Sequence, residues 1–311
     1  LKAAKEGSEA MPSRRSQDIL GLIRSHKKVA SRVSQNFVMK LEPSVELAAR
    51  MRIGATTAVV VPQLRFPALR VSPRRVEKMD AVLLHLHGGA YVSGGLLQSR
   101  ALMAPICAAS GLRALVFSYR LAPRAVYPAQ LEDALAAYDW LLNQGYPPEK
   151  ILLVGESAGG NLALALTDAL RRRGTGTPGA LCLLSPWADL AQRGESYRTL
   201  QAVDATLDAG ELMESARQFA GARSLEDPCI SPVYGDFTGF PPTQIHCGTH
   251  EILLSDSENV ERAMLRDGVK VQMIRWEGMC HVFQAFGFEE SRASINQIAL
   301  FLRRHAGLAE D

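Results

Sequence analysis

The chain has 311 residues, of which 47% are hydrophobic and 22% charged, a composition typical of a globular protein with a large buried core. Its formal net charge of +3 is weak and its basic clusters, such as Arg171-Arg172-Arg173, are short, which argues against a nucleic-acid-binding protein. No apolar stretch approaches the ~18 residues that a membrane-spanning helix requires.

The cysteines indicate a reducing compartment. They are odd in number and widely spaced, and none forms a Cys-x-x-Cys pair, so we predict free thiols and a cytoplasmic location. The N-terminal residues LKAAKEGSEAMPSRR contain no hydrophobic signal core, which agrees with this expectation. The five cysteines are Cys107, Cys182, Cys229, Cys247 and Cys280.

Short β-rich runs alternate with longer helical runs from residue 56 onward. Several of the runs are continuously apolar, as in strands that are covered on both faces, so we predict a mostly parallel sheet flanked by helices. The predicted strands are 56–61, 66–71, 81–86, 114–118, 151–154, 180–184, 243–247 and 270–275. The predicted helices are 98–109, 129–144, 160–173, 255–267 and 289–305.

Two segments lie outside this alternation. Residues 1–50 are polar and basic with helix-like apolar spacing, and residues 188–226 are polar and helical only in places. We expect both segments to contribute to a small helical cap over one edge of the sheet.

The run Gly155-Glu156-Ser157-Ala158-Gly159 follows the predicted strand 151–154 and precedes a predicted helix. Gly-x-Ser-x-Gly between a strand and a helix is typical of a nucleophile elbow, in which a sharp turn projects the serine from the sheet. Side chains at 155 and 159 would collide in such a turn. The helix N-terminus offers free N–H groups for a developing oxyanion, and the Ala158 amide is one of them.

A second glycine-rich segment, His87-Gly88-Gly89-Ala90, follows the predicted strand 81–86. Glycines allow the backbone to approach a ligand closely and to turn its amides toward it. We therefore predict that the amides of Gly88 and Gly89 join Ala158 in an oxyanion hole, while His87 holds the loop.

Neither histidine pattern in the chain indicates a metal site. His85 and His87 alternate along a strand, so they point to opposite faces and cannot bind one ion together. The segment beginning at His250 has Leu254 where a zinc-binding HExxH motif requires its second histidine. We expect neither a metal nor another cofactor.

Five segments occur in a fixed order: HGGAYVSGG, SYRLAPRAVYPAQLEDALAAYDWL, GESAGGNLALAL, LLSPWADL and FPPTQIHCGTHEILL. In this order they resemble the bacterial hormone-sensitive-lipase-like esterases, a branch of the α/β-hydrolase fold, over roughly residues 80–305. The resemblance implies a sheet of about eight strands, a cap drawn largely from the N-terminus, and hydrolysis of carboxylic esters with short acyl chains. It divides the chain into a cap segment, 1–50, and an α/β-hydrolase domain, 51–311. Ala90 departs from the family, which usually has a third glycine there.

A serine nucleophile needs a base and an acid, which follow it along the chain in this fold. His281 follows the predicted strand 270–275 in a short loop, where the family also has its histidine. Related esterases usually read Gly-x-x-Asp-x-Leu, and Glu251 occupies the acidic position of that motif here. Asp256 is the alternative acid, although a helix N-terminus also explains an acidic residue there.

We therefore expect a serine carboxylesterase that acts on small-molecule esters through Ser157, His281 and Glu251. One alternative is a receptor with the same fold that binds a small ligand without turnover. Another is an amide, lactone or carbohydrate-acetyl hydrolase that uses the same residues. Family members often pair through the last strand, so the resemblance leaves a homodimer open.

Overall fold

An eight-stranded sheet runs through the computed structural model, which describes residues 12–30, 53–76 and 80–308. The strand order is β1-β2-β4-β3-β5-β6-β7-β8; β2 runs antiparallel to β1 and to β4, and all the other pairs are parallel. The mostly parallel sheet of eight strands predicted from the sequence is thus confirmed. The strands are β1 (Thr56–Val60), β2 (Ala68–Pro73), β3 (Val82–Leu86), β4 (Arg113–Phe117), β5 (Ile151–Glu156), β6 (Ala180–Leu184), β7 (Thr243–Gly248) and β8 (Val271–Trp276).

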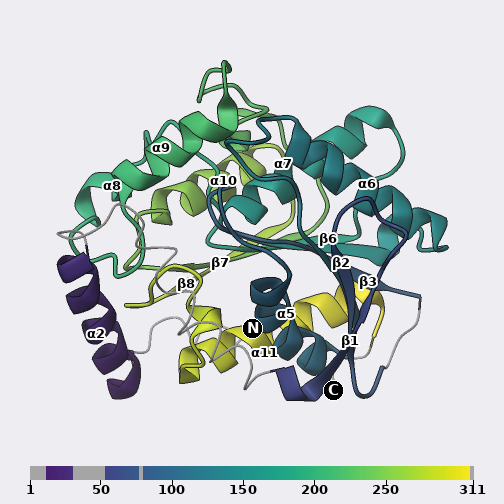
Figure 1. Cartoon of the computed structure of the whole chain (residues 1–311), viewed down its shortest axis with the longest axis horizontal. Coiled ribbons are helices and arrows are strands. Elements are labelled where there is room, and N and C mark those ends of the chain that lie inside the picture. Colours follow the sequence, from purple (N-terminus) through teal and green to yellow (C-terminus); the bar gives the residue numbers. More distant parts are fainter. Residues whose placement is uncertain (1–11, 31–52, 77–79, 309–311) are drawn as a thin grey trace.

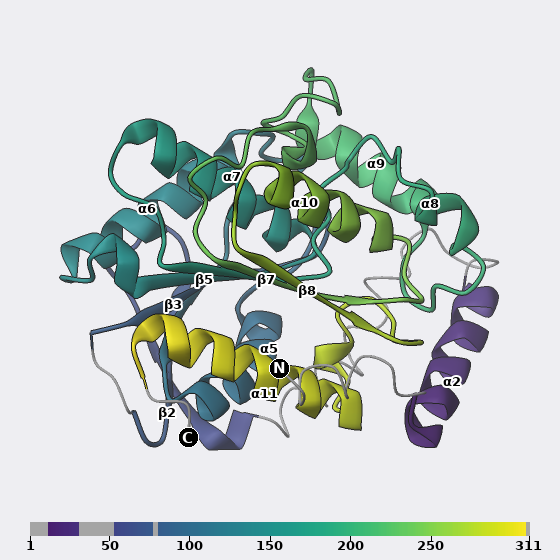
Figure 2. The ribbon, with the colours of Figure 1, turned by 180° about the vertical axis from the view of Figure 1, so that it is seen from behind.

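The central strands are buried on both faces because helices cover the sheet from both sides. Every residue of β3, β5, β6 and β7 is buried, whereas the edge strand β1 exposes Val59 and Val60. In Figures 1 and 2 the helices α6, α7 and α10 lie on one face, and α5 and α11 on the other. These helices span α5 (Leu96–Ser110), α6 (Ala129–Asn143), α7 (Ala158–Arg173), α10 (Leu254–Arg266) and α11 (Glu289–Ala306).

The helix α7 begins two residues earlier than the sequence predicted, directly after Ser157. The small residues Ala158, Gly159 and Gly160 form its first turn because the elbow is too crowded for larger side chains. Glycines in the left-handed conformation end α5, α7 and α11 at Gly111, Gly174 and Gly307.

In the part of the chain that the structure describes, three further helices lie outside the two layers that cover the sheet (Figure 1): α2 (Arg14–Ala30), α8 (Ser196–Thr199) and α9 (Ala209–Ala220). The apolar face of α2 packs against Trp276 and Phe288, and the Ser13 amide just before it donates to the Glu290 carboxylate at 2.5 Å. Most of the predicted N-terminal cap segment, residues 1–11 and 31–50, lies outside the described residues. Short 3-10 turns occupy Ile53–Ala55, Pro148–Lys150, Pro232–Tyr234 and Phe283–Ala285.

The parallel strands bring distant parts of the chain to one edge of the sheet. The carboxyl ends of β3, β5, β6, β7 and β8 all face the same way, and ligands of such sheets bind beyond these ends. The glycine-rich segment after β3, Ser157 after β5, Glu251 after β7 and His281 after β8 therefore all leave the sheet at this edge.

Candidate active site

Ser157 forms the whole turn between β5 and α7. Its φ of 55° is in the left-handed region, which only a strained turn imposes on a residue with a side chain. Its amide donates to the carbonyl of Leu184 at 2.9 Å, and its carbonyl accepts from the amide of Trp187 at 3.0 Å. The turn is thus attached to the segment that follows β6, and the serine side chain starts from a fixed position.

The glycines around Ser157 are required by close backbone contacts. A Cβ atom on Gly155 would lie 2.4 Å from the carbonyl oxygen of Gly159, and one on Gly159 would lie 1.9 Å from that of Leu86. Both distances are far inside van der Waals contact. The steric reason that the sequence suggested for these two glycines is confirmed.

The glycine-rich loop after β3 packs directly against the elbow, but not as the sequence predicted. The Gly88 amide donates to the Glu156 carboxylate at 2.8 Å, so it is not available to an oxyanion. The expectation for Gly88 is therefore wrong in this structure. Within the described residues, no acceptor is paired with the amides of Gly89, Ala90 or Ala158. Ala90 lies in the left-handed region with a φ of 52°, a conformation that a glycine at this position would adopt more easily.

Glu156 holds this loop from below. Its second carboxylate oxygen accepts from the ring Nε2 of the buried His85 at 2.6 Å, so one carboxylate links β3, β5 and the loop. His87 stacks on Tyr119 with a ring-centroid distance of 3.9 Å, and the Tyr119 hydroxyl donates to the His87 carbonyl at 2.6 Å. Burial lowers the pKa of His87 to about 4, so its ring is neutral at pH 7. The predicted role of His87 in holding the loop is confirmed.

Glu251 and His281 form a hydrogen-bonded pair beyond the ends of β7 and β8. The ring Nδ1 of His281 lies 2.7 Å from Oε2 of Glu251, and Glu251 is completely buried. An ionised carboxylate only accepts hydrogen bonds, so Nδ1 carries a proton and Nε2 is left to accept one. This is the arrangement by which an acid fixes the tautomer of a catalytic base.

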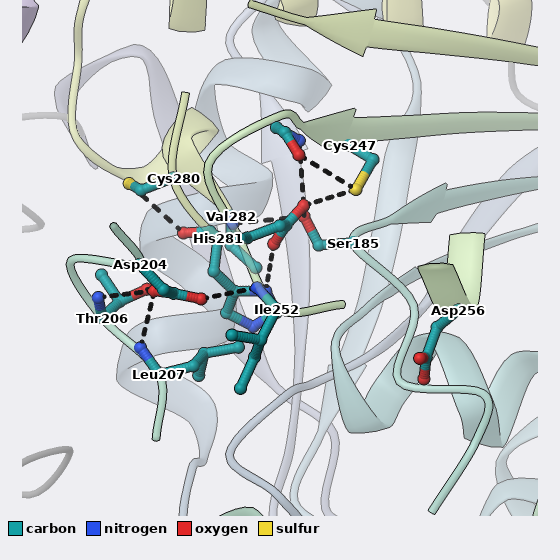
Figure 3. A network of polar contacts seen from close by, with 12 residues as sticks. Ser185, Asp204, Thr206, Leu207, Cys247, Ile252, Asp256, Cys280, His281 and Val282 are labelled. Carbon is teal, nitrogen blue, oxygen red and sulfur yellow. Dashed lines mark hydrogen bonds and ion pairs between the residues drawn. The ribbon is translucent and has the colours of Figure 1, made fainter. Parts of the chain in front are cut away.

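Asp256 has a different place in the structure. It lies in the first turn of α10 and accepts at one oxygen from the amides of Ala188 and Asp189, at 2.9 and 2.8 Å, and from the Tyr197 hydroxyl at 3.1 Å. Figure 3 shows Asp256 well apart from His281. Its carboxylate organises the segment after β6 and makes no contact with the imidazole.

The sequence did not single out Ser185 or Asp204. The Ser185 hydroxyl donates to Oε1 of Glu251 at 2.8 Å and accepts from the Val282 amide at 3.3 Å (Figure 3). Asp204 accepts from the Ile252 amide at 2.8 Å with one oxygen, and from the amides of residues 206 and 207 with the other. The motif LLSPWADL contains Ser185 and was a signal for it, whereas no motif in the sequence marks Asp204.

The consecutive residues Leu184 and Ser185 form hydrogen bonds with the elbow and with the loop that carries His281. Leu184 accepts from the Ser157 amide, and the next residue, Ser185, accepts from the amide that follows His281. Two consecutive residues of one chain segment therefore contact the backbone of Ser157 and of Val282. The structure brings the strand ends that carry Ser157, Glu251 and His281 into one hydrogen-bonded assembly.

His246 and Cys280, which also lie near the site, are buried and have structural positions. His246 is buried in β7, accepts at Nδ1 from Trp276 Nε1 at 3.1 Å, and has a pKa that burial lowers to about 3. Burial raises the pKa of the Cys280 thiol, so it stays protonated beside His281. No group of three or more metal-ligating side chains occurs in residues 12–30, 53–76 and 80–308.

A groove of about 830 Å³ opens beside the glycine-rich loop. The groove is lined by Gly89, Ala90 and Val92 of this loop and by Leu212 and Gln218 of the helix α9. Gly89 and Ala90, whose amides are unpaired within the described residues, therefore border the groove.

The comparisons with known proteins agree with this geometry. A sequence-family model described as alpha/beta hydrolase fold matches residues 83–285, which is more than half of the chain. The chain belongs to the α/β-hydrolase family.

Within that family, this hydrolase is similar to esterases of the hormone-sensitive-lipase branch. An acetyl-hydrolase of Streptomyces hygroscopicus is 40% identical over 227 residues, which cover 72% of this chain and 76% of that protein. The crystal structure of EstE5 superposes with a TM-score of 0.89 at 30% identity, covering 95% of this chain and 99% of that one. An esterase of the bacterial hormone-sensitive lipase family superposes with a TM-score of 0.85 at 32% identity, covering 96% and 100%.

The α/β hydrolase described here is therefore an enzyme, a carboxylic ester hydrolase of the hormone-sensitive-lipase-like branch. Among its described residues, no helix is both long enough and apolar enough to cross a membrane.

Proposed function

We propose that this α/β hydrolase is a serine carboxylesterase that cleaves esters with short acyl chains through Ser157, His281 and Glu251. The 2.7 Å contact between His281 and Glu251, at the sheet edge where the Ser157 elbow lies, carries the proposal. The contact with Glu251 holds His281 in the tautomer that a base requires, and the elbow holds Ser157 in a strained turn.

In the proposed reaction, Ser157 Oγ attacks the ester carbonyl carbon while His281 Nε2 takes the hydroxyl proton. The carbonyl π bond opens to a tetrahedral oxyanion. When this intermediate collapses, the bond to the alcohol breaks, and the alcohol leaves with the proton from His281. Water then attacks the acyl-enzyme, gives one proton to His281, and releases the carboxylic acid as Ser157 recovers its proton. Glu251 stabilises the imidazolium in both halves of the reaction.

The proposed oxyanion hole consists of the amides of Gly89, Ala90 and Ala158. Its support is that these three amides have no other partner in the described part of the chain, whereas that of Gly88 is bonded to Glu156. A donor of this type typically contributes about 10² to 10³ in rate. Backbone donors of this kind are already oriented before substrate binds.

The proposed substrate is a small ester whose acyl part fits between the glycine-rich loop and a cap. Residues 188–226, which include α9, are one part of that cap because α9 lines the groove beside Gly89. Residues 1–50 are proposed as the other part. The name of the Streptomyces relative, acetyl-hydrolase, supports a short acyl group.

Hydrolysis of p-nitrophenyl acetate tests the proposal. Wild-type enzyme should release a burst of p-nitrophenol followed by steady turnover, and Ser157→Ala should lower turnover by at least about 10³. Substitution of Ser110 by Ala, a buried serine at the opposite end of the sheet, serves as the control and should leave turnover unchanged. A Ser157→Ala variant with wild-type turnover, or a wild type that binds the ester without releasing p-nitrophenol, refutes the esterase proposal, and the second result favours a receptor. Esters of increasing acyl length, an anilide and a lactone then test the substrate class.

A further inference from the structure

Ser185 is a buried serine in the LLSPWADL motif that the reaction above does not use. It follows β6 directly, its amide donates to the carbonyl of His246 at 2.8 Å, and its own side chain is completely buried. Its φ of 47° lies in the left-handed region. A residue with a side chain occupies such a conformation only where the surrounding structure enforces it, and such positions concentrate at functional sites.

The Ser185 hydroxyl contacts both the acid and the segment of the base. A carboxylate only accepts and an amide only donates, so the hydroxyl must donate to Glu251 at 2.8 Å and accept from the Val282 amide at 3.3 Å. Val282 follows His281 and also has a left-handed φ, of 47°. One hydroxyl group thus links the end of β6 to the acid after β7 and to the loop after β8.

The acid depends on such donors because it is completely buried. Oε1 of Glu251 accepts from the Gly248 amide at 2.9 Å, from the Cys247 thiol and from Ser185, while Oε2 faces His281. Donors to a buried carboxylate favour its ionised form and fix the rotation of its plane. Gly248 and Cys247 belong to the same strand end as the acid, whereas Ser185 comes from the end of β6 and also accepts a hydrogen bond from the Val282 amide beside the base.

We infer that Ser185 is a positioning residue for the proposed reaction, which orients the Glu251 carboxylate and ties it to the loop that carries His281. The inference rests on the proposed function, because it assigns Ser185 an effect on the pair that activates Ser157. It requires no contact between Ser185 and the substrate. Loss of the hydroxyl should therefore change kcat and leave KM nearly unchanged.

Other ionisable groups near the pair do not obscure this effect. The thiols of Cys247 and Cys280 have pKa values raised by burial and stay neutral in the assay range. Asp204 and Arg24 lie near Cys280, and Arg24 contacts His250 at 3.3 Å, but none of these groups is altered by a substitution at 185. Removing the hydroxyl takes away a donor that shares the charge of the Glu251 carboxylate, so the attraction of this carboxylate for the imidazole proton is stronger. The acidic limb of the kcat/KM profile should accordingly move to higher pH.

The test compares Ser185→Ala with Ser110→Ala on p-nitrophenyl acetate from pH 5 to pH 9. Ser110 is also a buried serine whose Oγ accepts from a backbone amide, that of Leu112 at 3.3 Å, at the opposite end of the sheet. Ser185→Ala should lower kcat about 10- to 100-fold with little change in KM and should shift the acidic limb upward. Ser110→Ala should leave both properties unchanged. Ser185→Cys keeps a side chain of similar size with a weak donor, and should give an intermediate kcat.

The outcomes separate this inference from the proposed function. Wild-type kcat and an unshifted acidic limb in Ser185→Ala overturn the positioning role, while the esterase proposal stands on Ser157→Ala. A lower kcat with an unshifted limb, matched by Ser110→Ala, also overturns it, since both variants would then report only loosened packing. If Ser185→Ala does not fold, a Ser185→Cys variant that folds with wild-type kcat and limb overturns the inference, and an intermediate kcat supports it.

Discussion

Replacing Glu251 by glutamine should reverse the tautomer of His281. The substitution keeps the shape of the side chain and exchanges one carboxylate oxygen for an NH₂ group. Oε1 accepts from the Gly248 amide and from Ser185, so the single amide oxygen of glutamine must occupy that position. The NH₂ group then faces Nδ1 of His281, which lies 2.7 Å from the other carboxylate oxygen.

The size of the effect follows from this geometry. An NH₂ group donates, so Nδ1 of His281 must give up its proton, which moves to Nε2 and removes the acceptor that Ser157 requires. A wrong tautomer combined with loss of the negative charge costs about 10⁴ in kcat, equivalent to about 5 kcal/mol. KM should change little, because Glu251 is completely buried and has no route to the substrate.

The assay is steady-state hydrolysis of p-nitrophenyl acetate at pH 7.5, with circular dichroism to confirm folding. Asp256→Asn is the matched control because the Asp256 oxygen that accepts from Ala188 and Asp189 can be replaced by the asparagine oxygen. Burial also raises the pKa of Asp256, so removing its charge should cost little. A Glu251→Gln enzyme within tenfold of wild type, or an Asp256→Asn enzyme that loses as much as Glu251→Gln, would refute the assignment of the acid.

Three further predictions concern the stability of the site. Gly159→Ala places a Cβ atom 1.9 Å from the carbonyl oxygen of Leu86, so we expect little folded protein in a soluble-expression assay. The control variant Gly21→Ala should express normally, because its Cβ atom meets open space. A soluble and active Gly159→Ala variant would contradict the steric argument. Asp204 accepts hydrogen bonds on both carboxylate oxygens, whereas asparagine has one side-chain oxygen, so Asp204→Asn leaves some of these donors unpaired. Urea denaturation should show a free energy of unfolding that is lower by about 1–3 kcal/mol. An unchanged denaturation midpoint would contradict this prediction. Burial lowers the pKa of His246 from 6.5 to about 3, so between these pH values the unfolded chain binds a proton that the folded chain excludes. The contribution of neutral His246 to the free energy of unfolding is therefore fully present above pH 6.5 and should be lost as the pH falls toward 3. Calorimetry should show a falling Tm between pH 7 and pH 4, with a smaller decrease in His246→Gln; an equal decrease in both proteins would refute this contribution.

Much of the fold was predictable because local patterns in the chain agree with the final structure. The apolar runs that become β3, β5 and β6 are too short for buried helices and are separated by helical patterns, so their order along the chain implied a parallel sheet. The elbow was equally predictable, since the Gly155 and Gly159 contacts are set by a turn of few residues.

The identity of the oxyanion donors could not be predicted from local sequence. Gly88 and Gly89 look equivalent in the chain, but the Glu156 carboxylate, 68 residues away, accepts from one of them. Only the pairing of β3 with β5 brings that carboxylate beneath the loop. The choice among Gly88, Gly89 and Ala90 is therefore a tertiary property.

The sequence by itself determined the strand–turn–helix elements and the chain order of Ser157, Glu251 and His281, because steric limits and hydrophobic periodicity act over a few residues. The tertiary structure decided which carboxylate meets the imidazole, and it revealed the contacts of Ser185, whose motif did not show its partner, and of Asp204, which no motif marks. A hydrogen bond forms only when donor and acceptor lie within about 3.5 Å of each other. The partners at this edge come from strands far apart in the chain, so they are specified only once the sheet has aligned its strand ends.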